Sequence, residues 1–369
     1  MATKIPLLDL KREHAAIGAE VTALWAESLK EMHLLKGPHG TAFEQEIAAY
    51  IGTAHAVGTS SGTDALALGL CGIGIAPGDE VIVHANAFTA DIEAIRMAGA
   101  HPVLVDVAEG GLGPDPAAVA AAVTPRTRAL MVVHLYGSPL PLAPLLDVTR
   151  RHNVALVEDA SHAHGAARDR KRVGSYGVVG CFSCGVVKNL GAYGDAGFVA
   201  TNDAEVANRV RLYQTHGQEK KNHHVLYGGN YRLDEVQAAV LRVKLRSLDA
   251  RNARRAKIAA HYSARFAPLG IAVPVEGPNE VHVYHQYVIR TPRRDALSAH
   301  LKQSDIETGI HYPIPLHRQP AWLRAYGETP SFPRAERLTS EILSLPVFPD
   351  LTDAEVERVA DAVVAFFRQ

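Results

Sequence analysis

Six short, continuously apolar runs rich in β-branched residues recur between residues 80 and 201 of this chain. They are EVIVHA (80–85), PVLVDV (102–107), ALMVVHLYG (129–137), VALVED (154–159), VGCFSC (179–184) and GFVAT (197–201). Strands of this kind are buried on both faces, as in a parallel or mostly parallel sheet. Helical patterns lie between some of them, at 91–100 and 141–152. The alternation predicts an α/β domain whose sheet has helices on both faces.

The pattern changes near residue 235. Apolar residues recur at spacings of three and four through 234–266, which predicts one long amphipathic helix or two joined helices. The chain is then mixed and proline-rich, and a last helix is predicted at 353–367. We expect a large α/β domain at 1–249 and a small α+β domain at 250–369, with roughly the first 12 residues packed on the small domain.

Charge and motifs exclude several classes of partner. The chain has 38 basic and 39 acidic residues and a net charge of −1, whereas nucleic acids and membrane surfaces attract clustered positive charge. The N-terminal sequence MATKIPLLDLKREHAA lacks the apolar segment of a signal peptide, and no run is long enough to span a membrane. Neither a Walker A motif nor a G-x-G-x-x-G sequence is present. We therefore expect a cytoplasmic protein without an ATP or dinucleotide site.

The three cysteines, Cys71, Cys181 and Cys184, cannot all pair within one chain, which fits a reducing compartment. Cys181 and Cys184 form a C-x-x-C, but a separation of three in a strand places them on opposite faces. No second C-x-x-C and no histidine at zinc spacing accompanies them. We expect two buried cysteines and no metal site.

Lys188 lies between an apolar strand and a glycine-rich turn, in SCGVVKNLGAYGDAGFV (183–199). Asp159 ends another apolar run, at the end of a strand where ligands of open α/β sheets bind. An amine that binds an aldehyde and a carboxylate that binds a pyridinium nitrogen are the two groups that pyridoxal phosphate needs. Taken alone, Lys188 also fits a surface lysine and Asp159 also fits a helix N-cap.

Six ordered motifs make the chain resemble one known family. They are GTSSGTDALALGL (58–70), HANAFTADIEAI (84–95), VHLYGSP (133–139), VEDASHAHGA (157–166), FSCGVVKNLGAYGDAGFVATND (182–203) and GNYRLDEVQAAVLRVKL (229–245). Their order and spacing resemble the DegT/DnrJ/EryC1/StrS aminotransferases, which are sugar aminotransferases of fold type I. The resemblance runs from residues 35–52 to residues 343–359.

The resemblance implies a role for each matching residue. Lys188 would form the Schiff base and move protons as a neutral amine, with its pKa lowered by burial and by nearby positive charge. Asp159 would bind the pyridine nitrogen, and Phe88 would stack on the ring. The phosphate would be bound by Gly62, Thr63 and Ser183 and by Asn230 of a neighbouring subunit, so the enzyme would be a homodimer with shared sites.

Other positions depart from the family pattern or match it weakly. His162 replaces the usual glutamine at the cofactor phenolic oxygen, and unlike glutamine it can carry charge. Its neighbour His164 fits a structural role. Residues 184–187 lack the hydroxyl that relatives often have before the lysine, and Tyr231 replaces a small residue. The predicted substrate contacts are Tyr231, Arg232, Tyr312 and His317.

The resemblance implies an enzyme that moves an amino group from an amino acid to a nucleotide-linked keto sugar, by way of pyridoxamine phosphate. Glutamate is the expected donor, with glutamine used by some cyclitol relatives. An aminotransferase for a cyclitol or another carbocyclic ketone stays open. Two further alternatives are a dehydratase, against which Lys188 argues because dehydratases of the family have histidine there, and a non-catalytic regulator that binds the cofactor.

Overall fold

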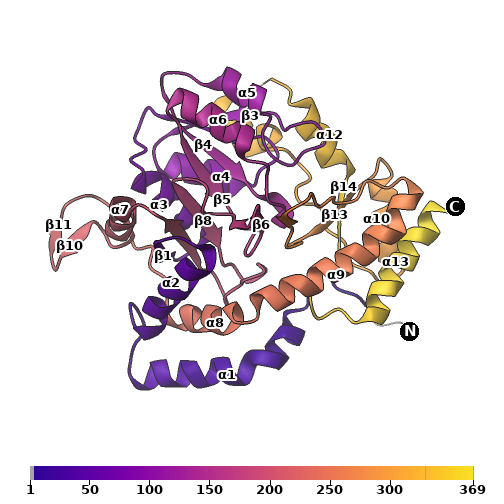
Figure 1. Cartoon of the computed structure of the whole chain (residues 1–369), viewed down its shortest axis with the longest axis horizontal. Coiled ribbons are helices and arrows are strands. Elements are labelled where there is room, and N and C mark those ends of the chain that lie inside the picture. The colour runs from indigo at the N-terminus through magenta and orange to yellow at the C-terminus, as the bar shows by residue number, and fades with distance from the viewer. Residues whose placement is uncertain (1–3, 329, 369) are drawn as a thin grey trace.

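A seven-stranded sheet forms the centre of the computed structural model, which describes residues 4–328 and 330–368 (Figure 1). The strands are, in spatial order, β1 (His55–Thr59), β9 (Gly197–Thr201), β8 (Val179–Ser183), β5 (Ala155–Asp159), β4 (Thr127–Val133), β2 (Glu80–His84) and β3 (His101–Val105). The five strands from β8 to β3 are parallel, and β9 is antiparallel to both of its neighbours. The mostly parallel sheet predicted from the sequence is thus confirmed, and the run at 197–201 is its antiparallel exception.

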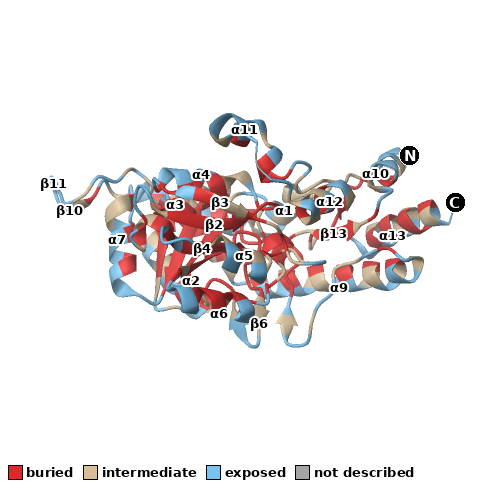
Figure 2. Ribbon diagram, turned by 90° about the horizontal axis from the view of Figure 1, so that it is seen from above, coloured by how far each residue is buried: buried red, intermediate tan, exposed pale blue. Residues whose placement is uncertain are grey.

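Alternate residues of the strands face two layers of helices, as the period of two in a strand requires. One face packs on α3 (Gly62–Gly72), α4 (Thr89–Met97) and α7 (Ala204–Gln214). The other face packs on α2 (Pro38–Ile51), α5 (Pro116–Ala122), α6 (Ala143–His152) and α8 (Glu235–Leu245). Figure 2 shows the strands buried between the helices. α1 (Leu10–Lys30) lies against α8.

A second core lies beside the sheet domain. It is built from α9 (Leu248–Phe266), α10 (Arg294–Gln303), α13 (Asp353–Phe367) and the antiparallel pair β13 (Tyr287–Arg290) and β14 (Ile342–Leu345) (Figure 1). Ile5 near the N-terminus is fully buried in this core. The predicted helical stretch 234–266 forms two helices, α8 and α9. The division of the chain near residue 249 stays a prediction.

The remaining elements are short connections and hairpins. They are β6 (Ala167–Arg168), β7 (Lys171–Arg172), β10 (Gln218–Lys220), β11 (His223–His224), β12 (Glu280–Val281), α11 (Pro320–Tyr326), α12 (Pro333–Glu341), and the 3₁₀ turns η1 (Leu135–Gly137), η2 (Ala267–Leu269) and η3 (Leu316–Arg318). Within the described ranges, no helix combines the length and apolar character needed to cross a bilayer.

Cys181 and Cys184 are buried free thiols in different layers of the core, as the strand geometry predicts. Cys181 faces the α3 side of the sheet and Cys184 packs with the α2 and α8 side. Among residues 4–328 and 330–368, no three His, Cys, Asp or Glu side chains are grouped as metal ligands would be.

Candidate active site

The site lies at the carboxyl edge of the parallel strands, where the loops after β2, β4, β5 and β8 meet. The loop after β8 carries Lys188, whose N–H donates to the Gly185 carbonyl at 2.9 Å. Burial is the main influence on the Lys188 amine and lowers its pKa, which favours the neutral form. The charged groups nearest the amine include Asp159 and Asp91, which oppose that shift. The expected contribution of nearby positive charge is therefore wrong, and burial alone accounts for the direction.

Asp159 is the last residue of β5 and is 5% exposed. Its Oδ1 accepts a hydrogen bond from the Ser161 N–H at 2.9 Å, which holds the carboxylate at the start of the turn after β5. The next regular element of the described chain is β6, so Asp159 does not cap a helix. That leaves its second oxygen for a ligand at the end of the strand.

The first turn of α3 forms the α3 cup, the candidate site for the cofactor phosphate. Ser61 caps the helix by accepting from the Asp64 N–H at 3.1 Å, and the first intrahelical bond runs from the Ala65 N–H to the Ser61 carbonyl. The N–H groups of Gly62 and Thr63 therefore face outward from the helix end, where an anion is favoured. Both serine hydroxyls of the motif, on Ser60 and Ser61, donate to Asp64. The backbone is thus the main donor in this cup.

Ser183 closes the cup opposite Gly62. A β-carbon added at Gly62 would lie 2.3 Å from the Ser183 β-carbon, far inside the contact distance of two carbon atoms. The Ser183 N–H donates to Ser161 at 3.1 Å, which ties the end of β8 to the turn that follows Asp159. Only glycine allows α3 to begin this close to β8, so the structure brings together the three phosphate ligands predicted from the sequence.

Phe88 stands at the start of α4 and contacts the segment between α10 and η3. Its ring centroid lies 4.8 Å from that of Tyr312, with an angle of 32° between the planes. Burial, followed by the charges of Asp159 and Asp91, raises the pKa of the Tyr312 phenol. The structure thus brings Tyr312 close to Asp159 and Asp91, and its contact with substrate stays a prediction.

His162 and His164 differ in their surroundings. The Nδ1 atom of His162 accepts from the Tyr136 N–H at 3.3 Å, so the neutral ring carries its proton on Nε2. Burial, with Lys188 and two nearby histidines, holds the pKa of His162 well below its usual range. The charged form considered from the sequence is therefore disfavoured, and the neutral ring has an N–H at Nε2. His164 is buried against Phe182, 3.8 Å from the Cys184 sulfur, which fits its structural role.

Asn230 and its neighbours lie on the outer side of the α3 cup. The Asn230 side chain is exposed and accepts from the Arg232 Nε at 2.8 Å. The Ser60 N–H donates to the Tyr231 carbonyl at 3.0 Å, which attaches this segment to the strand that leads into α3. Tyr231 lines a cavity of about 350 Å³ together with Asp64. No hydrogen bond within the described chain joins Asn230 to Gly62, Thr63 or Ser183.

His317 and residues 184–187 complete the predicted set. The His317 ring has no exposed surface, and its Nε2 lies 2.7 Å from Glu336, so we leave it out of the proposed site. Val186 and Val187 are exposed beside Lys188, and neither supplies a hydroxyl.

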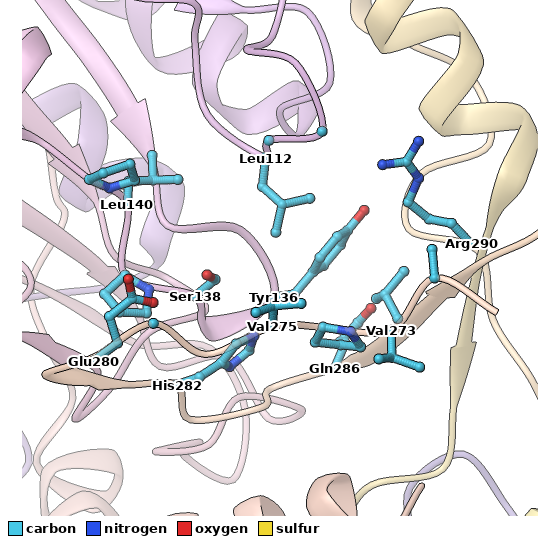
Figure 3. Close-up of a pocket in the computed structure, with 18 of the residues that line it drawn as sticks. Leu112, Tyr136, Ser138, Leu140, Val273, Val275, Glu280, His282, Gln286 and Arg290 are labelled. Atoms are coloured by element: carbon cyan, nitrogen blue, oxygen red, sulfur yellow. The ribbon is translucent and has the colours of Figure 1, made fainter. Parts of the chain in front are cut away.

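A cavity of about 490 Å³ lies next to these residues, between the two cores, and contains neither Lys188 nor Asp159 (Figure 3). Tyr136 projects into it from η1, facing Gln286 and Arg290 of the second core. The Tyr136 hydroxyl donates to the His311 carbonyl, and its N–H donates to His162. Tyr136 thus forms a wall between this cavity and the site.

Two groups at the site escaped the sequence reasoning. Tyr136 adopts a left-handed backbone conformation (φ 61°), which no local sequence signal predicts. Asp91 is fully buried in the first turn of α4. An aspartate at such a position is ordinarily explained by its favourable interaction with the helix dipole. Its place three residues after Phe88, in a motif already assigned to the cofactor, was the available signal.

Fold and site together define a pyridoxal-phosphate-dependent transaminase of fold type I. The chain belongs to the DegT/DnrJ/EryC1/StrS aminotransferase family, whose model matches residues 15–364. It is 45% identical over 364 residues to the dTDP-3-amino-3,4,6-trideoxy-alpha-D-glucose transaminase of Streptomyces venezuelae, covering 98% of this chain and 95% of that protein.

Solved structures agree with this assignment. The crystal structure of S. venezuelae DesV in complex with a ketimine intermediate superposes with a TM-score of 0.97 at 44% identity, covering all of both chains. The NtdA protein of Bacillus subtilis, solved with its cofactor PMP, gives a TM-score of 0.94 at 29% identity over all of this chain and 86% of that chain. Pyridoxal phosphate and pyridoxamine phosphate are therefore the cofactors of this family.

Proposed function

We propose that this enzyme transfers an amino group from glutamate to carbon 3 of a keto sugar attached to a nucleoside diphosphate. The observation that carries the proposal is the joint placement of Lys188, Asp159 and the Gly62–Ser183 cup at one sheet edge. These are the groups needed to hold an aldehyde, a pyridine nitrogen and a phosphate.

The cofactor, when bound, supplies a carbonyl that carries nitrogen and a ring that withdraws electrons from the reacting carbon. Lys188 holds the cofactor covalently and then, as a free neutral amine, moves the proton at the reacting carbon. Asp159 keeps the ring nitrogen protonated, and the N–H groups of Gly62 and Thr63 hold the phosphate. The His162 Nε2–H is the donor for the phenolic oxygen.

The substrate class is supported by what relatives act on. The S. venezuelae relative is named for a dTDP-linked 3-amino sugar, and a 39% identical protein of Acidithiobacillus ferrooxidans is named as a 3-aminotransferase of a UDP-linked sugar. Both names place the new amino group on carbon 3. A carbocyclic ketone is the second candidate for the amino acceptor. The residues proposed around Lys188 bind the cofactor, so they do not distinguish a sugar ring from a carbocyclic ring.

The test is an amino-transfer screen with the purified enzyme. Nitrogen-15 glutamate is offered with dTDP- and UDP-linked 3-keto sugars, with the matching 4-keto sugars and with a keto cyclitol. We expect label in the 3-amino nucleotide sugar and none when Lys188→Ala is used. Label only in the cyclitol would replace this proposal by the second candidate.

We further propose a homodimer in which Asn230 binds the phosphate of its partner. Exposed apolar side chains near the α3 cup support this: Leu34 and Leu35 before α2, and Val225 and Tyr227 after the β10–β11 hairpin. Patches of this kind mark protein contacts. Within one chain Asn230 is exposed and bonded only to Arg232, which leaves its amide free for a partner.

Mixing two inactive variants will test the shared site. Lys188→Ala and Asn230→Ala are each expected to be crippled, yet a hybrid dimer has one site with both residues intact. Random mixing should therefore restore about a quarter of wild-type turnover. Verified hybrids that recover nothing would place Asn230 in its own subunit's site.

Gly62→Ala should loosen the phosphate cup. Its β-carbon would lie 2.3 Å from the Ser183 β-carbon, so α3 and β8 must separate. We expect affinity for pyridoxal phosphate to fall by about tenfold or more in an absorbance titration. Gly185→Ala is the matched control, because its nearest neighbouring atom would be 3.5 Å away. Equal affinity in the two variants would contradict the proposed cup.

A further inference from the structure

Asp91 is a fully buried carboxyl group that the site described above leaves unexplained. It is 0% exposed in the first turn of α4, and neither of its oxygens has a hydrogen-bond donor within normal geometry. The Phe88 N–H lies near enough to Asp91 to lower its pKa slightly, but it does not meet the distance and angle of a hydrogen bond. Burying an ionised carboxylate without a hydrogen-bond donor costs several kcal/mol of folding free energy. Packing alone therefore does not explain why an aspartate stands at this position.

The groups that face Asp91 come from four elements. Asp159 at the end of β5 lies within side-chain hydrogen-bonding reach. The Lys188 amine approaches from the loop after β8, and the Cys181 thiol from β8 itself. The Tyr312 phenol approaches from the segment between α10 and η3. Asp91 therefore stands behind the carboxylate that we assign to the pyridine nitrogen.

Two carboxyl groups this close share one proton, because two adjacent negative charges in a dry site repel strongly. The hydrogen bonds decide which group holds the proton. Asp159 accepts the Ser161 N–H at 2.9 Å, whereas neither oxygen of Asp91 has such a donor. Burial, followed by the Asp159 charge, raises the pKa of Asp91 well above its ordinary value. Asp91 is thus the protonated member of the pair.

We propose that Asp91 is a positioning residue: a neutral carboxylic acid that donates a hydrogen bond to Asp159 and fixes the carboxylate that meets the cofactor ring. The proposal rests on the role assigned to Asp159 above. It gives the pair a single negative charge, which matches the single positive charge of a protonated pyridine.

The neutral state of Asp91 also serves Lys188. An ionised Asp91 would raise the pKa of the Lys188 amine, against the lowering that burial produces. A protonated Asp91 adds no second negative charge beside the amine. The same proton therefore orients Asp159 and keeps Lys188 available as a base.

Three variants separate positioning from packing. Asp91→Asn keeps the shape and an N–H donor but cannot ionise, Asp91→Ala removes the donor, and Asp91→Leu fills the space without any polar group. The readouts are the dissociation constant for pyridoxamine phosphate and the pH at which the visible absorption band of the loaded enzyme changes. Thermal unfolding of each loaded variant is measured beside them.

We expect Asp91→Asn to keep the wild-type affinity for pyridoxamine phosphate within about threefold and to keep the wild-type absorption titration. Asp91→Ala and Asp91→Leu should each lose about tenfold in this affinity and shift the pH at which the absorption band changes. Asp91→Leu should nevertheless unfold at a temperature equal to or above that of wild type, since it replaces a buried carboxyl group by an apolar side chain. A leucine variant with the wild-type absorption titration and affinity would show that Asp91 only fills space and would overturn the proposal.

The pH dependence of unfolding gives a second readout. A carboxyl whose pKa is raised on folding binds its proton more tightly in the folded state, so this contribution to stability falls as pH rises above its unfolded pKa, near 4. Asp91→Asn has no such proton. Its unfolding temperature relative to wild type should therefore increase steadily from pH 5 towards the folded pKa. A constant difference over that range would contradict a protonated Asp91.

Asp159→Asn, measured in the same assays, separates the two proposals. If Asp159→Asn leaves the absorption titration unchanged, the role of Asp159 fails and this inference fails with it. If Asp159→Asn alters the titration and the Asp91 variants do not, the proposed function stands and only the role of Asp91 is lost.

Discussion

Lys188→Ala will lower turnover by more than about 1000-fold, because it removes both the covalent attachment and the amine that moves the proton. Asp159 and Asp91 both lie close enough to the Lys188 amine to influence its pKa, which places this amine at the proposed site. Turnover is measured as glutamate-dependent amination under single-turnover and steady-state conditions. The variant should still bind pyridoxamine phosphate, since the cup at Gly62 and Ser183 is untouched.

The control for this prediction is Lys257→Ala, which removes an exposed lysine of α9. Borohydride treatment of the wild-type and Lys257→Ala enzymes should attach the cofactor at Lys188 and at no other position, as read by peptide mass. Turnover of Lys188→Ala within tenfold of wild type, or reductive labelling at another lysine, would remove Lys188 from the proposed mechanism.

Asp159→Asn should slow proton abstraction by roughly 100-fold or more while the cofactor stays bound. The amide oxygen can still accept the Ser161 N–H, so the turn after β5 keeps its geometry. What is lost is the negative charge that keeps the ring nitrogen protonated, and with it the electron-withdrawing power of the ring. The rate is followed by stopped-flow absorbance with α-deuterated and ordinary glutamate.

A larger deuterium isotope effect in Asp159→Asn than in wild type would show that proton abstraction is the slowed step. The matched control is Asp147→Asn on the outer surface of α6, where the carboxylate pairs only with Arg150. Equal single-turnover rates for wild type and Asp159→Asn would mean that the ring nitrogen does not depend on this carboxylate.

Much of the sheet domain could be predicted from the sequence. Six buried apolar runs became six strands of the sheet, because a strand buried on both faces has no polar alternation to obscure it. The direction of β9 could not be read in this way, since an apolar strand looks the same in either orientation. The first strand, His55–Thr59, was also missed: it is short and runs directly into the serine-glycine turn.

Those parts of the site that lie within a single short motif could also be predicted from the sequence. Lys188, Asp159 and the Gly62–Thr63 turn each sit in a motif whose chemistry can be inferred within a few residues. The protonation states of the side chains at the site could not be predicted, because pKa values depend on neighbours from other helices and strands. Positive charge was expected near Lys188, but the structure brings two carboxylates there. His162 was considered as a charged group, but its burial keeps it neutral.

Sequence alone thus determined the α/β class, the family resemblance and the two residues that define the chemistry, because periodicity and short motifs are local properties of the chain. Only the tertiary structure decided how those residues are held. It placed the Asp91 carboxyl, from the first turn of α4, beside Asp159 at the end of β5, and it buried both side chains. The electrostatics of a buried site depend on distances across elements, and a linear sequence does not contain those distances.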